Sequence, residues 1–373
     1  MNEFLRKAIY KIRQYLDQFF GTLVDFLQKI RLIKRFTAFR ITPIGPVVQV
    51  NHPYPANYRE EDQVFFQTWK KYETLSLEIY SVKDVRVTTE GAVLKGILPF
   101  IPALPHPVFR FKFGLLYNLL TRIRYRKLAA PDTKYLLVYD FWSKANYYHW
   151  CIDSLCRLWM SHEFLKGERV LLLPDKPPSY IADSIKAFGI TRIEYIPPFS
   201  LLEVRQVEVM NYAAGSGRHH PEILNKVREF FVRPFRVNED ILKRKIYVSR
   251  GKQSSRRVYN ETELIGLLQQ YGFEIHYFEG MNLHEQIALM QETAVFISSH
   301  GANMTNCLFL PEKAKVLELI NNRKPNFCYW SVCASIGIPY YYQLCVLAES
   351  DHIIVDLEEL RKNLILLEEE ASV

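Results

Sequence analysis

The sequence predicts an α/β protein made of two doubly wound domains that face a cleft. Its 373 residues suit two domains of roughly 100–200 residues each. Its composition, 49% hydrophobic and 24% charged, is typical of a globular protein with a sizeable core. From residue 134 onward, strand-like and helix-like segments alternate, which is the pattern of parallel sheets with helices on both faces.

The first block of alternation defines an N-terminal domain at residues 41–212. Strands are expected at short apolar runs, and helices where apolar residues recur every three or four positions. The expected strands are 135–139, 170–173, 193–196 and 204–210, and the expected helices are 146–165 and 179–188. Residues 41–130 are rich in aromatic residues and proline, with short β-like runs at 47–50, 77–80 and 85–88, and are assigned to the same domain.

A polar, glycine-containing break at 213–221 opens the second block, which defines a C-terminal domain at residues 213–345. The expected strands are 246–248, 274–278, 294–297, 316–320 and 339–344, and the expected helices are 222–232, 260–270, 283–292, 302–309 and 326–335. The last segment, 346–373, is read as a strand followed by an amphipathic helix at 358–370. It is a candidate for packing back on the N-terminal domain.

The first 40 residues carry most of the positive charge. They hold nine Lys and Arg against three Asp and Glu, in a chain with a net charge of +8. Apolar residues recur at helical spacing from Leu5 to Ile30, so we expect residues 1–40 to form a basic amphipathic helix. Such a helix suits an anionic membrane surface or a partner groove. The alternative is a helix packed on its own domain.

Two features of the sequence bear on the cellular location of the protein. No apolar run approaches the ~20 residues of a membrane-spanning helix, and no signal-peptide core with a cleavage site is found. The six cysteines form no CxxC pair and lie in apolar segments, where reduced cysteine behaves as a small hydrophobe. We therefore expect a cytoplasmic protein, held at the inner membrane if the basic helix binds there.

The stretch Ser298-Ser-His-Gly-Ala-Asn-Met-Thr-Asn306 stands where a strand passes into a helix. Backbone N–H groups at a helix start favour a phosphate or carboxylate, and glycine lets the backbone approach a ligand closely. The residues that could contribute are His300, Gly301, Asn303, Thr305 and Asn306. The alternative is an ordinary helix cap with a histidine satisfied nearby.

A second stretch, from Tyr247 to Glu261, also joins a strand to a helix, and it carries four cations. Arginine presents a planar fork to phosphate oxygens, so a diphosphate would suit this loop. Its candidate ligand-binding residues are Arg250, Lys252, Arg256, Arg257 and Asn260. The alternative is a solvated basic loop.

The third stretch is the helix that begins near Asn146. His149 and Asp153 are four residues apart and share one helix face, so the carboxylate could act as a general base beside the imidazole. Tyr148 and Trp150 could stack on a sugar or base. The alternative is a buried helix with an internal His–Asp pair. Separately, Glu318 ends a strand, where an acid can bind a ribose hydroxyl pair or simply lie on the surface.

Several signals are absent from the sequence. There is no GxGxxG, no GxxxxGK[ST] and no Asp-x-Asp, so the divalent-metal diphosphate site of the last type is unsupported and no metal is expected. Basic patches interleaved with aromatic residues are missing outside the N-terminus, so no nucleic-acid partner is expected.

Four segments together resemble glycosyltransferase family 61. They are "NYYHWCIDSLCRL", "YVSRGKQSSRRVYNETEL", "YGFEIHYFEGMNLHEQIALMQETAVFISSHGANMTNCLFLP" and "KVLELI", in the family's order. The resemblance covers roughly residues 135–320. It departs at Asn303-Met304, where Gly-Leu is common, and at Cys156, where proline is usual.

The resemblance implies a GT-B-like fold of two Rossmann-type domains and a metal-independent, inverting transfer from a nucleotide sugar, UDP- or GDP-linked. Asp153 would be the base, with His149 beside it. The donor would lie on the C-terminal domain, against the cations of the second stretch, the 300–306 segment with Ala302, and Glu318. The acceptor, a glycan or lipid-linked glycan, would face Asn146, Tyr148, Trp150 and Arg157.

The expected role is synthesis of capsule, exopolysaccharide or lipopolysaccharide in a bacterium. Two other functions stay open. One is a non-catalytic nucleotide- or glycan-binding protein on the same fold, in which replacing Asp153 changes little. The other is nucleic-acid binding through residues 1–40, which would show steep salt dependence.

Overall fold

The computed structural model describes residues 38–45, 47–96, 98–104, 125–127, 133–165, 167–237 and 244–369, with positions 15, 19 and 22. The predicted basic helix of residues 1–40 lies outside the described residues, apart from these isolated positions and the start of a strand. Within the described ranges, no helix has both the length and the apolar composition needed to cross a membrane.

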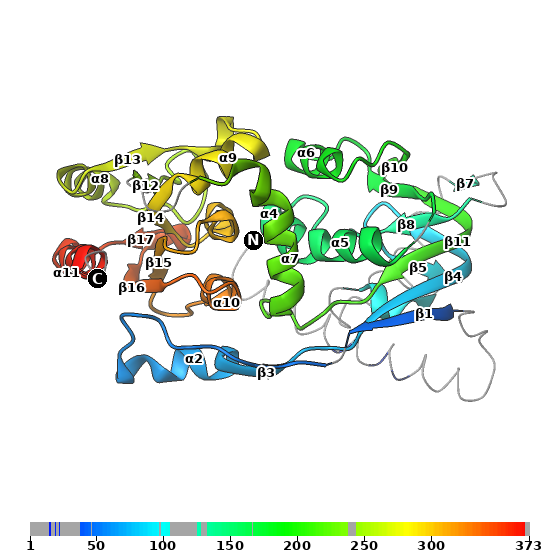
Figure 1. Ribbon diagram of the computed structural model, residues 1–373, viewed down its shortest axis with the longest axis horizontal. Coiled ribbons are helices and arrows are strands. Elements are labelled where there is room, and N and C mark those ends of the chain that lie inside the picture. The colour runs from blue at the N-terminus through cyan, green and yellow to red at the C-terminus, as the bar shows by residue number, and fades with distance from the viewer. Residues whose placement is uncertain are drawn as a thin grey trace. The chain divides into compact units, whose positions relative to one another are not determined.

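The chain divides into two compact units, coloured along the chain in Figure 1. Unit 1 comprises Met1–Val47 and Leu75–Ser216, and unit 2 comprises Val48–Thr74 and Gly217–Val373. Residues 48–74 therefore belong with the C-terminal half, although the sequence places them in the N-terminal domain. They form β2 (Gln49–Asn51), η1 (Glu60–Asp62), α2 (Gln63–Lys70) and β3 (Lys71–Glu73).

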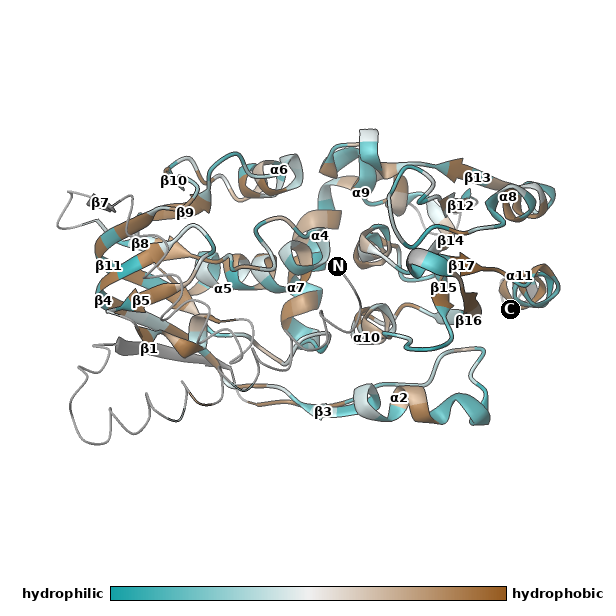
Figure 2. Cartoon of the chain, turned by 180° about the vertical axis from the view of Figure 1, so that it is seen from behind, coloured by the Kyte–Doolittle hydropathy of each residue, from teal (hydrophilic) through white to brown (hydrophobic). Residues whose placement is uncertain are grey.

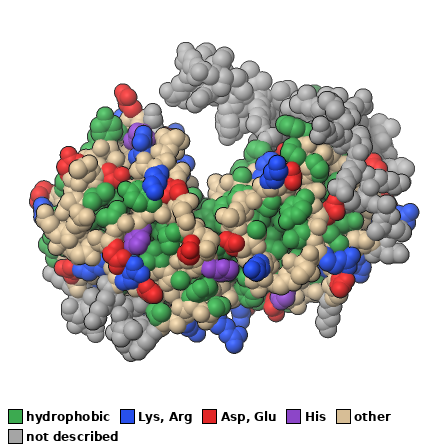
Figure 3. All heavy atoms as spheres, turned by 90° about the horizontal axis from the view of Figure 1, so that it is seen from above, with side chains coloured by type: hydrophobic (Ala, Val, Ile, Leu, Met, Phe, Trp, Pro, Cys, Tyr) green, Lys and Arg blue, Asp and Glu red, His purple; other side chains and the backbone are tan. Residues whose placement is uncertain are grey.

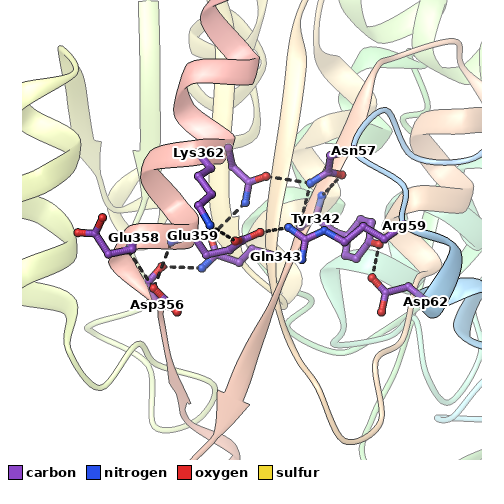
Figure 4. Close-up of polar contacts among 10 residues, drawn as sticks. Asn57, Arg59, Asp62, Tyr342, Gln343, Asp356, Glu358, Glu359 and Lys362 are labelled. Carbon is purple, nitrogen blue, oxygen red and sulfur yellow. Dashed lines mark hydrogen bonds and ion pairs between the residues drawn. The ribbon is translucent and has the colours of Figure 1, made fainter.

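A polar network explains why residues 48–74 join unit 2 (Figure 4). The Asn57 amide bonds both backbone groups of Tyr342, donating to the carbonyl at 2.8 Å and accepting from the N–H at 3.1 Å. The Tyr342 hydroxyl donates to Asp62 at 2.5 Å, and Arg59 pairs with Glu359 near the C-terminus. These partners lie 280 to 300 positions apart, so local periodicity cannot report them.

Unit 1 is built on a mixed sheet with the strand order β10-β9-β8-β11-β4-β5-β6. β10, β9, β8 and β11 run parallel, β7 also pairs parallel with β11, and β4 pairs antiparallel with β11. The expected doubly wound sheet therefore accounts for half of this unit. A short turn joins β4 to β5, and such a turn can connect only antiparallel strands.

The strands of unit 1 are β1 (Ala38–Gly45), β4 (Leu77–Thr88), β5 (Val93–Lys95), β6 (Leu98–Pro99), β7 (Tyr125–Lys127), β8 (Tyr135–Leu137), β9 (Val170–Pro174), β10 (Ile193–Ile196) and β11 (Leu201–Met210). Its helical elements are η2 (Ile101–Ala103), α4 (Tyr147–His149), the π-helical turn η5 (Trp150–Ser154), α5 (Leu155–Phe164) and α6 (Ser179–Ala187). The two β-like runs expected at 77–80 and 85–88 belong to the single strand β4.

Unit 2 is built on a sheet with the order β13-β12-β14-β15-β16-β17, in which only β17 is antiparallel. Its strands are β12 (Arg244–Val248), β13 (Phe273–His276), β14 (Thr293–Ser299), β15 (Lys315–Asn321), β16 (Tyr340–Leu347) and β17 (Ile353–Ile354). Its helices are α7 (Pro221–Val232), η6 (Arg233–Phe235), α8 (Glu261–Gln270), η8 (Phe278–Gly280), α9 (Leu283–Gln291), the 3-10 helix η9 (Ala302–Phe309), α10 (Cys328–Ser335), η10 (Glu349–Asp351) and α11 (Leu357–Glu369).

Helices cover both faces of the unit 2 sheet, with α8 and α11 on one face and α9 and α10 on the other (Figure 1). The central strands are apolar runs, which appear brown in Figure 2, as expected for strands buried on both faces. Leu360, Leu364 and Leu367 of α11 join the same core as Tyr247 and Leu264. The C-terminal segment thus packs on unit 2, because its apolar stripe completes this core, and the expectation that it returns to the N-terminal domain is wrong.

Candidate functional site

The strand order of unit 2 contains one topological switch point, between β12 and β14. The chain leaves β12 toward β13 on one side and later continues from β14 to β15 on the other. Crevices at such points, outside the carboxyl ends of the strands, are where open α/β sheets bind ligands. Arg250 follows β12 by two residues and His300 follows β14 by one, so both lie at this edge.

Arg250 is a buried cation at the switch point, with 8% of its surface exposed. Its guanidinium lies against Gly301, since a Cβ there would be 2.3 Å from Nη1 and 2.6 Å from Cζ. Nη2 donates to the Ser255 carbonyl at 3.3 Å, whereas the buried Nε has no hydrogen-bond partner among the described residues. Burial lowers the pKa of Arg250, and the positive charge of Arg256 lowers it further.

No described Asp or Glu forms an ion pair with Arg250. A buried guanidinium without a carboxylate is costly unless an anion joins it. An anion bound beside Arg250, between the ends of β12 and β14, would offset this cost.

His300 is held by Glu318, a residue of β15 that is 0% exposed. The imidazole Nδ1 and Glu318 Oε1 are 2.5 Å apart, and the Tyr340 hydroxyl donates to Oε2 at 2.5 Å. Both carboxylate oxygens are thus occupied. Glu318 is neither a ribose-binding acid nor a surface carboxylate, because burial and these two donors commit it to positioning His300.

This contact also determines the role of each imidazole nitrogen. An ionised carboxylate only accepts hydrogen bonds, so Nδ1 of His300 carries the proton in the contact with Glu318. Nε2 is then the nitrogen that can face a ligand. The ring also packs edge-on against Tyr329, with centroids 5.2 Å apart.

The segment after Gly301 forms a 3-10 helix whose polar residues divide into two groups. Thr305 and Asn306 are buried, and the Asn306 amide donates to Gln286 Oε1 and to the Asn303 carbonyl, each at 3.1 Å. Asn306 therefore stabilises the turn instead of pointing its amide nitrogen at a ligand. Asn303 and Ala302 are partly exposed, and the buried Nδ2 of Asn303 has no described partner.

The other candidate ligand residues on the basic loop differ in whether their side chains are exposed or already hydrogen-bonded. Lys252, Arg256 and Arg257 are exposed. Asn260, in contrast, bonds both backbone groups of Val355, at 2.8 and 3.0 Å. Its assignment as a nucleotide ligand is wrong, since both ends of its amide connect the loop to the chain after β17.

A residue not singled out from the sequence holds this loop in shape. Glu261, at the start of α8, accepts from the Tyr247 hydroxyl at 2.7 Å and from Ser249 Oγ at 2.8 Å. Ser249 Oγ in turn accepts the Gly251 N–H at 2.9 Å. The position of Glu261 beside four cations is a signal that could have drawn attention to it.

In unit 1, His149 and Asp153 form the expected pair, with Nδ1 and Oδ2 2.8 Å apart. Their side chains are 18% and 17% exposed, so the pair is accessible. Asn146 caps the helix by accepting the His149 N–H at 3.3 Å. The π-helical turn Trp150–Ser154 begins directly after His149 and contains Asp153, and such turns are found at many functional sites.

Three of the four expected acceptor-side residues are buried. Trp150 is 0% exposed and its indole N–H donates to Ser184 Oγ at 2.9 Å, so it supports the helix instead of stacking on a sugar. Arg157 is buried in an ion pair with Asp140 at 2.9 Å. Tyr148 is buried with its ring edge-on to His149. Asn146 is exposed and serves as the helix cap.

Asp140, Trp142 and Tyr212 of unit 1 were not singled out from the sequence. Asp140 follows β8, where its Oδ1 accepts the N–H groups of Trp142 at 2.7 Å and Ser143 at 3.1 Å. Its Oδ2 accepts from Arg157 and from the hydroxyl of Tyr212, which follows β11. The chain continues from β8 to β9 and β10 on one side, and β11 lies on the other side of β8. The cluster therefore lies at a second topological switch point, between β8 and β11.

Asp140 thereby places Trp142, which stacks on the imidazole of His149 with ring centroids 4.8 Å apart. Trp142 is partly exposed and could replace Trp150 as the surface for a sugar. Within the described ranges, no three His, Cys, Asp or Glu side chains are grouped so as to hold a metal ion.

Comparison with known proteins adds to this geometry. Residues 147–317 match the family model described as Glycosyltransferase 61. The chain is 35% identical over 97 residues to the EGF domain-specific O-linked N-acetylglucosamine transferase of Drosophila melanogaster, covering 25% of this chain and 18% of that protein. It is 32% identical over 90 residues to that of Rattus norvegicus, covering 23% and 17%. The chain thus spans less than a fifth of the length of these relatives.

Proposed function

The chain belongs, over residues 147–317, to glycosyltransferase family 61, and on that premise we propose that it transfers a sugar from a nucleotide sugar to a glycan acceptor. The observation that supports this most directly is Arg250, a buried guanidinium without a described acidic partner at the switch point of unit 2. A diphosphate has the charge and the oxygen geometry that such a group binds.

The donor side of the proposal uses unit 2. Arg250 and His300 Nε2 bind the diphosphate, with the exposed Lys252, Arg256 and Arg257 adding positive charge. Asn303 supplies an amide donor. These groups stabilise the negative charge that develops on the leaving diphosphate, so no essential metal is needed.

The acceptor side uses the His149–Asp153 pair. The acceptor hydroxyl oxygen forms a bond to the anomeric carbon while the bond from that carbon to the diphosphate breaks, and the configuration inverts. The hydroxyl proton must pass to a base. Asp153 Oδ2 already accepts from His149 Nδ1, so the geometry favours Nε2 of His149 as the proton acceptor, with Asp153 orienting the ring. This reverses the roles expected from the sequence.

The identity of donor and acceptor follows from chemistry and resemblance. The names of the relatives say that they transfer N-acetylglucosamine to EGF domains, so UDP- and GDP-linked sugars, with N-acetylglucosamine among them, are the first donors to test. We propose a glycan or lipid-linked glycan as acceptor, in bacterial capsule, exopolysaccharide or lipopolysaccharide synthesis. The GT-B-like fold, the cytoplasmic location and membrane attachment through residues 1–40 belong to the same proposal.

A nucleic-acid partner is not part of it. On the described part of the face shown in Figure 3, Lys and Arg side chains are interspersed with Asp and Glu instead of forming one basic surface. Nucleic-acid binding draws on clustered positive charge.

The test is a panel of nucleotide sugars, with UDP and GDP as references, measured by the shift in melting temperature and then by transfer to glycan acceptors. One strongly stabilising nucleotide sugar, followed by transfer that persists in EDTA, is the expected result. Stabilisation without turnover for any acceptor would favour the non-catalytic alternative, whereas transfer that is lost in Asp153→Asn while donor stabilisation stays unchanged would support the enzyme.

A further inference from the structure

A nucleotide sugar carries a flat aromatic base beside its diphosphate. We propose that Tyr277 is the stacking platform for the base of the donor nucleotide, and that Lys252, which lies over its ring, turns to the diphosphate when the nucleotide binds. This inference rests on the proposed function and assigns a part of the donor that no residue discussed above accounts for.

Tyr277 leaves the same edge of the sheet as Arg250. It directly follows β13, which runs parallel to β12, with His276 paired to Val248. The Ser249 N–H donates to the His276 carbonyl at 2.9 Å. Neighbouring strands lie about 4.8 Å apart, so Tyr277 begins one strand away from the residues that lead to the Arg250 guanidinium.

The loop that carries Tyr277 is anchored on both sides of the ring. Phe278 is buried, and the Met281 N–H donates to its carbonyl at 3.1 Å. Glu279 accepts from Gln253 Nε2 at 2.5 Å, which connects this loop to the basic loop after β12. A platform fixed in advance costs less ordering entropy when the base binds.

The ring itself is available and has a cation beside it. Tyr277 is 36% exposed, so part of its side chain can be reached by a ligand. The Lys252 ammonium lies 4.5 Å from the ring centroid. A Cβ on Gly251 would be 3.8 Å from Tyr277 Cε1, so the basic loop already contacts the ring edge. Lys252 has a long flexible side chain, so its ammonium can move from the ring of Tyr277 to a phosphate oxygen when the base stacks on the ring.

Tyr259 provides a matched control on the same basic loop. Its side chain is 74% exposed, but its N–H donates to the Ile353 carbonyl at 2.7 Å. It therefore lies beside β17, at the opposite end of the sheet order from β13. If Tyr277 made only non-specific contacts with the nucleotide, Tyr277→Ala would change nucleotide affinity as little as Tyr259→Ala.

The experiment is calorimetric titration of the full chain, as wild type, Tyr277→Ala, Tyr277→Phe and Tyr259→Ala, with UDP, GDP and pyrophosphate. Tyr277→Ala should weaken binding of the preferred nucleoside diphosphate by roughly tenfold or more, the effect of losing one base–aromatic stack. Pyrophosphate binding should stay unchanged, because it has no base. Tyr277→Phe and Tyr259→Ala should bind the nucleotide like the wild type.

Unchanged nucleotide affinity in Tyr277→Ala would overturn the inference alone. An equal loss of pyrophosphate affinity would also overturn it, because Tyr277 would then act through the phosphate loop. If the wild type binds neither UDP nor GDP, the proposed function itself fails before any variant is compared.

Discussion

The guanidinium of Arg250 occupies the space that a side chain at Gly301 would fill. An ideal Cβ at residue 301 would lie 2.3 Å from Arg250 Nη1, far inside van der Waals contact. The backbone at Gly301 is extended, with φ of 160°, so space and not conformation requires glycine there. The loops after β12 and β14 are therefore fitted to each other around one cation.

Gly301→Ala should displace this guanidinium and weaken nucleoside diphosphate binding by roughly tenfold or more, since one charge-assisted phosphate contact contributes about 1.5–3 kcal/mol. Titration calorimetry measures the change. Gly266→Ala, in α8 with open space around the Cβ, is the control. It should leave binding intact and raise stability by about 0.5–1 kcal/mol through helix propensity. Wild-type affinity in Gly301→Ala would show that Arg250 does not hold the phosphate.

The His149–Asp153 pair should matter for turnover and not for donor binding. His149→Gln should lower kcat by about 10²–10⁴-fold, the usual contribution of a general base, while nucleotide affinity in unit 2 stays unchanged. Asp153→Asn should lower kcat as well, because an amide no longer stabilises the charged ring. Initial rates with the identified donor decide the matter. If His149→Gln keeps most of its kcat while Asp153→Asn is inactive, Asp153 and not His149 is the base.

The buried Glu318 should act through His300. In Glu318→Gln, an amide N–H would face either His300 Nδ1–H or the Tyr340 hydroxyl, which leaves a buried donor without an acceptor. Unfolding free energy should fall by about 1–3 kcal/mol, and kcat should fall more than donor affinity. Tyr340→Phe keeps the His300–Glu318 contact, so its kcat should remain closer to wild type. If both variants lose kcat equally, Glu318 acts on the fold and not through His300.

Two buried histidines predict that unit 2 loses stability in mild acid. Burial lowers the pKa of His52 to about 4, with Lys70 adding to the effect, and burial lowers the pKa of His219 to about 3. The ordinary value is 6.5, so below it the unfolded chain binds protons that the folded chain does not. Stability should therefore fall as the pH drops from 6.5 toward 4.

The expected loss between pH 7 and pH 5 is about 4 kcal/mol, roughly half from each histidine, read from urea unfolding at each pH. His52→Gln should flatten this dependence, since Gln does not titrate. A free energy of unfolding that rises or stays constant on acidification would contradict the assignment of both histidines as buried and neutral.

Much of the fold follows from local pattern. Every strand and helix expected between residues 134 and 345 is found within a few positions of its expected bounds, because apolar periodicity and polar breaks report burial directly. The order of the strands in each sheet, in contrast, does not follow from local pattern. The switch point between β12 and β14 depends on which strands pair, and no local signal in Ile246–Val248 or Ala294–Ile297 specifies a neighbour.

The site residues divide in the same way. Arg250, His300, His149 and Asp153 are recognisable because polar groups follow apolar strands or share a helix face. Glu318 and Trp150 were misassigned because residue type does not reveal burial. Asp140 and Trp142 were missed because their role depends on contacts with Arg157 and Tyr212, up to 72 positions away in sequence.

The most direct measurement is the affinity of the wild type, Arg250→Ala and Arg257→Ala for UDP and GDP by titration calorimetry, with thermal unfolding measured on each. We expect Arg250→Ala to lose roughly a hundredfold in affinity for the preferred nucleotide, and the exposed Arg257→Ala to lose far less. Wild-type affinity in a folded Arg250→Ala variant would contradict the assignment of the crevice between β12 and β14 as the diphosphate site.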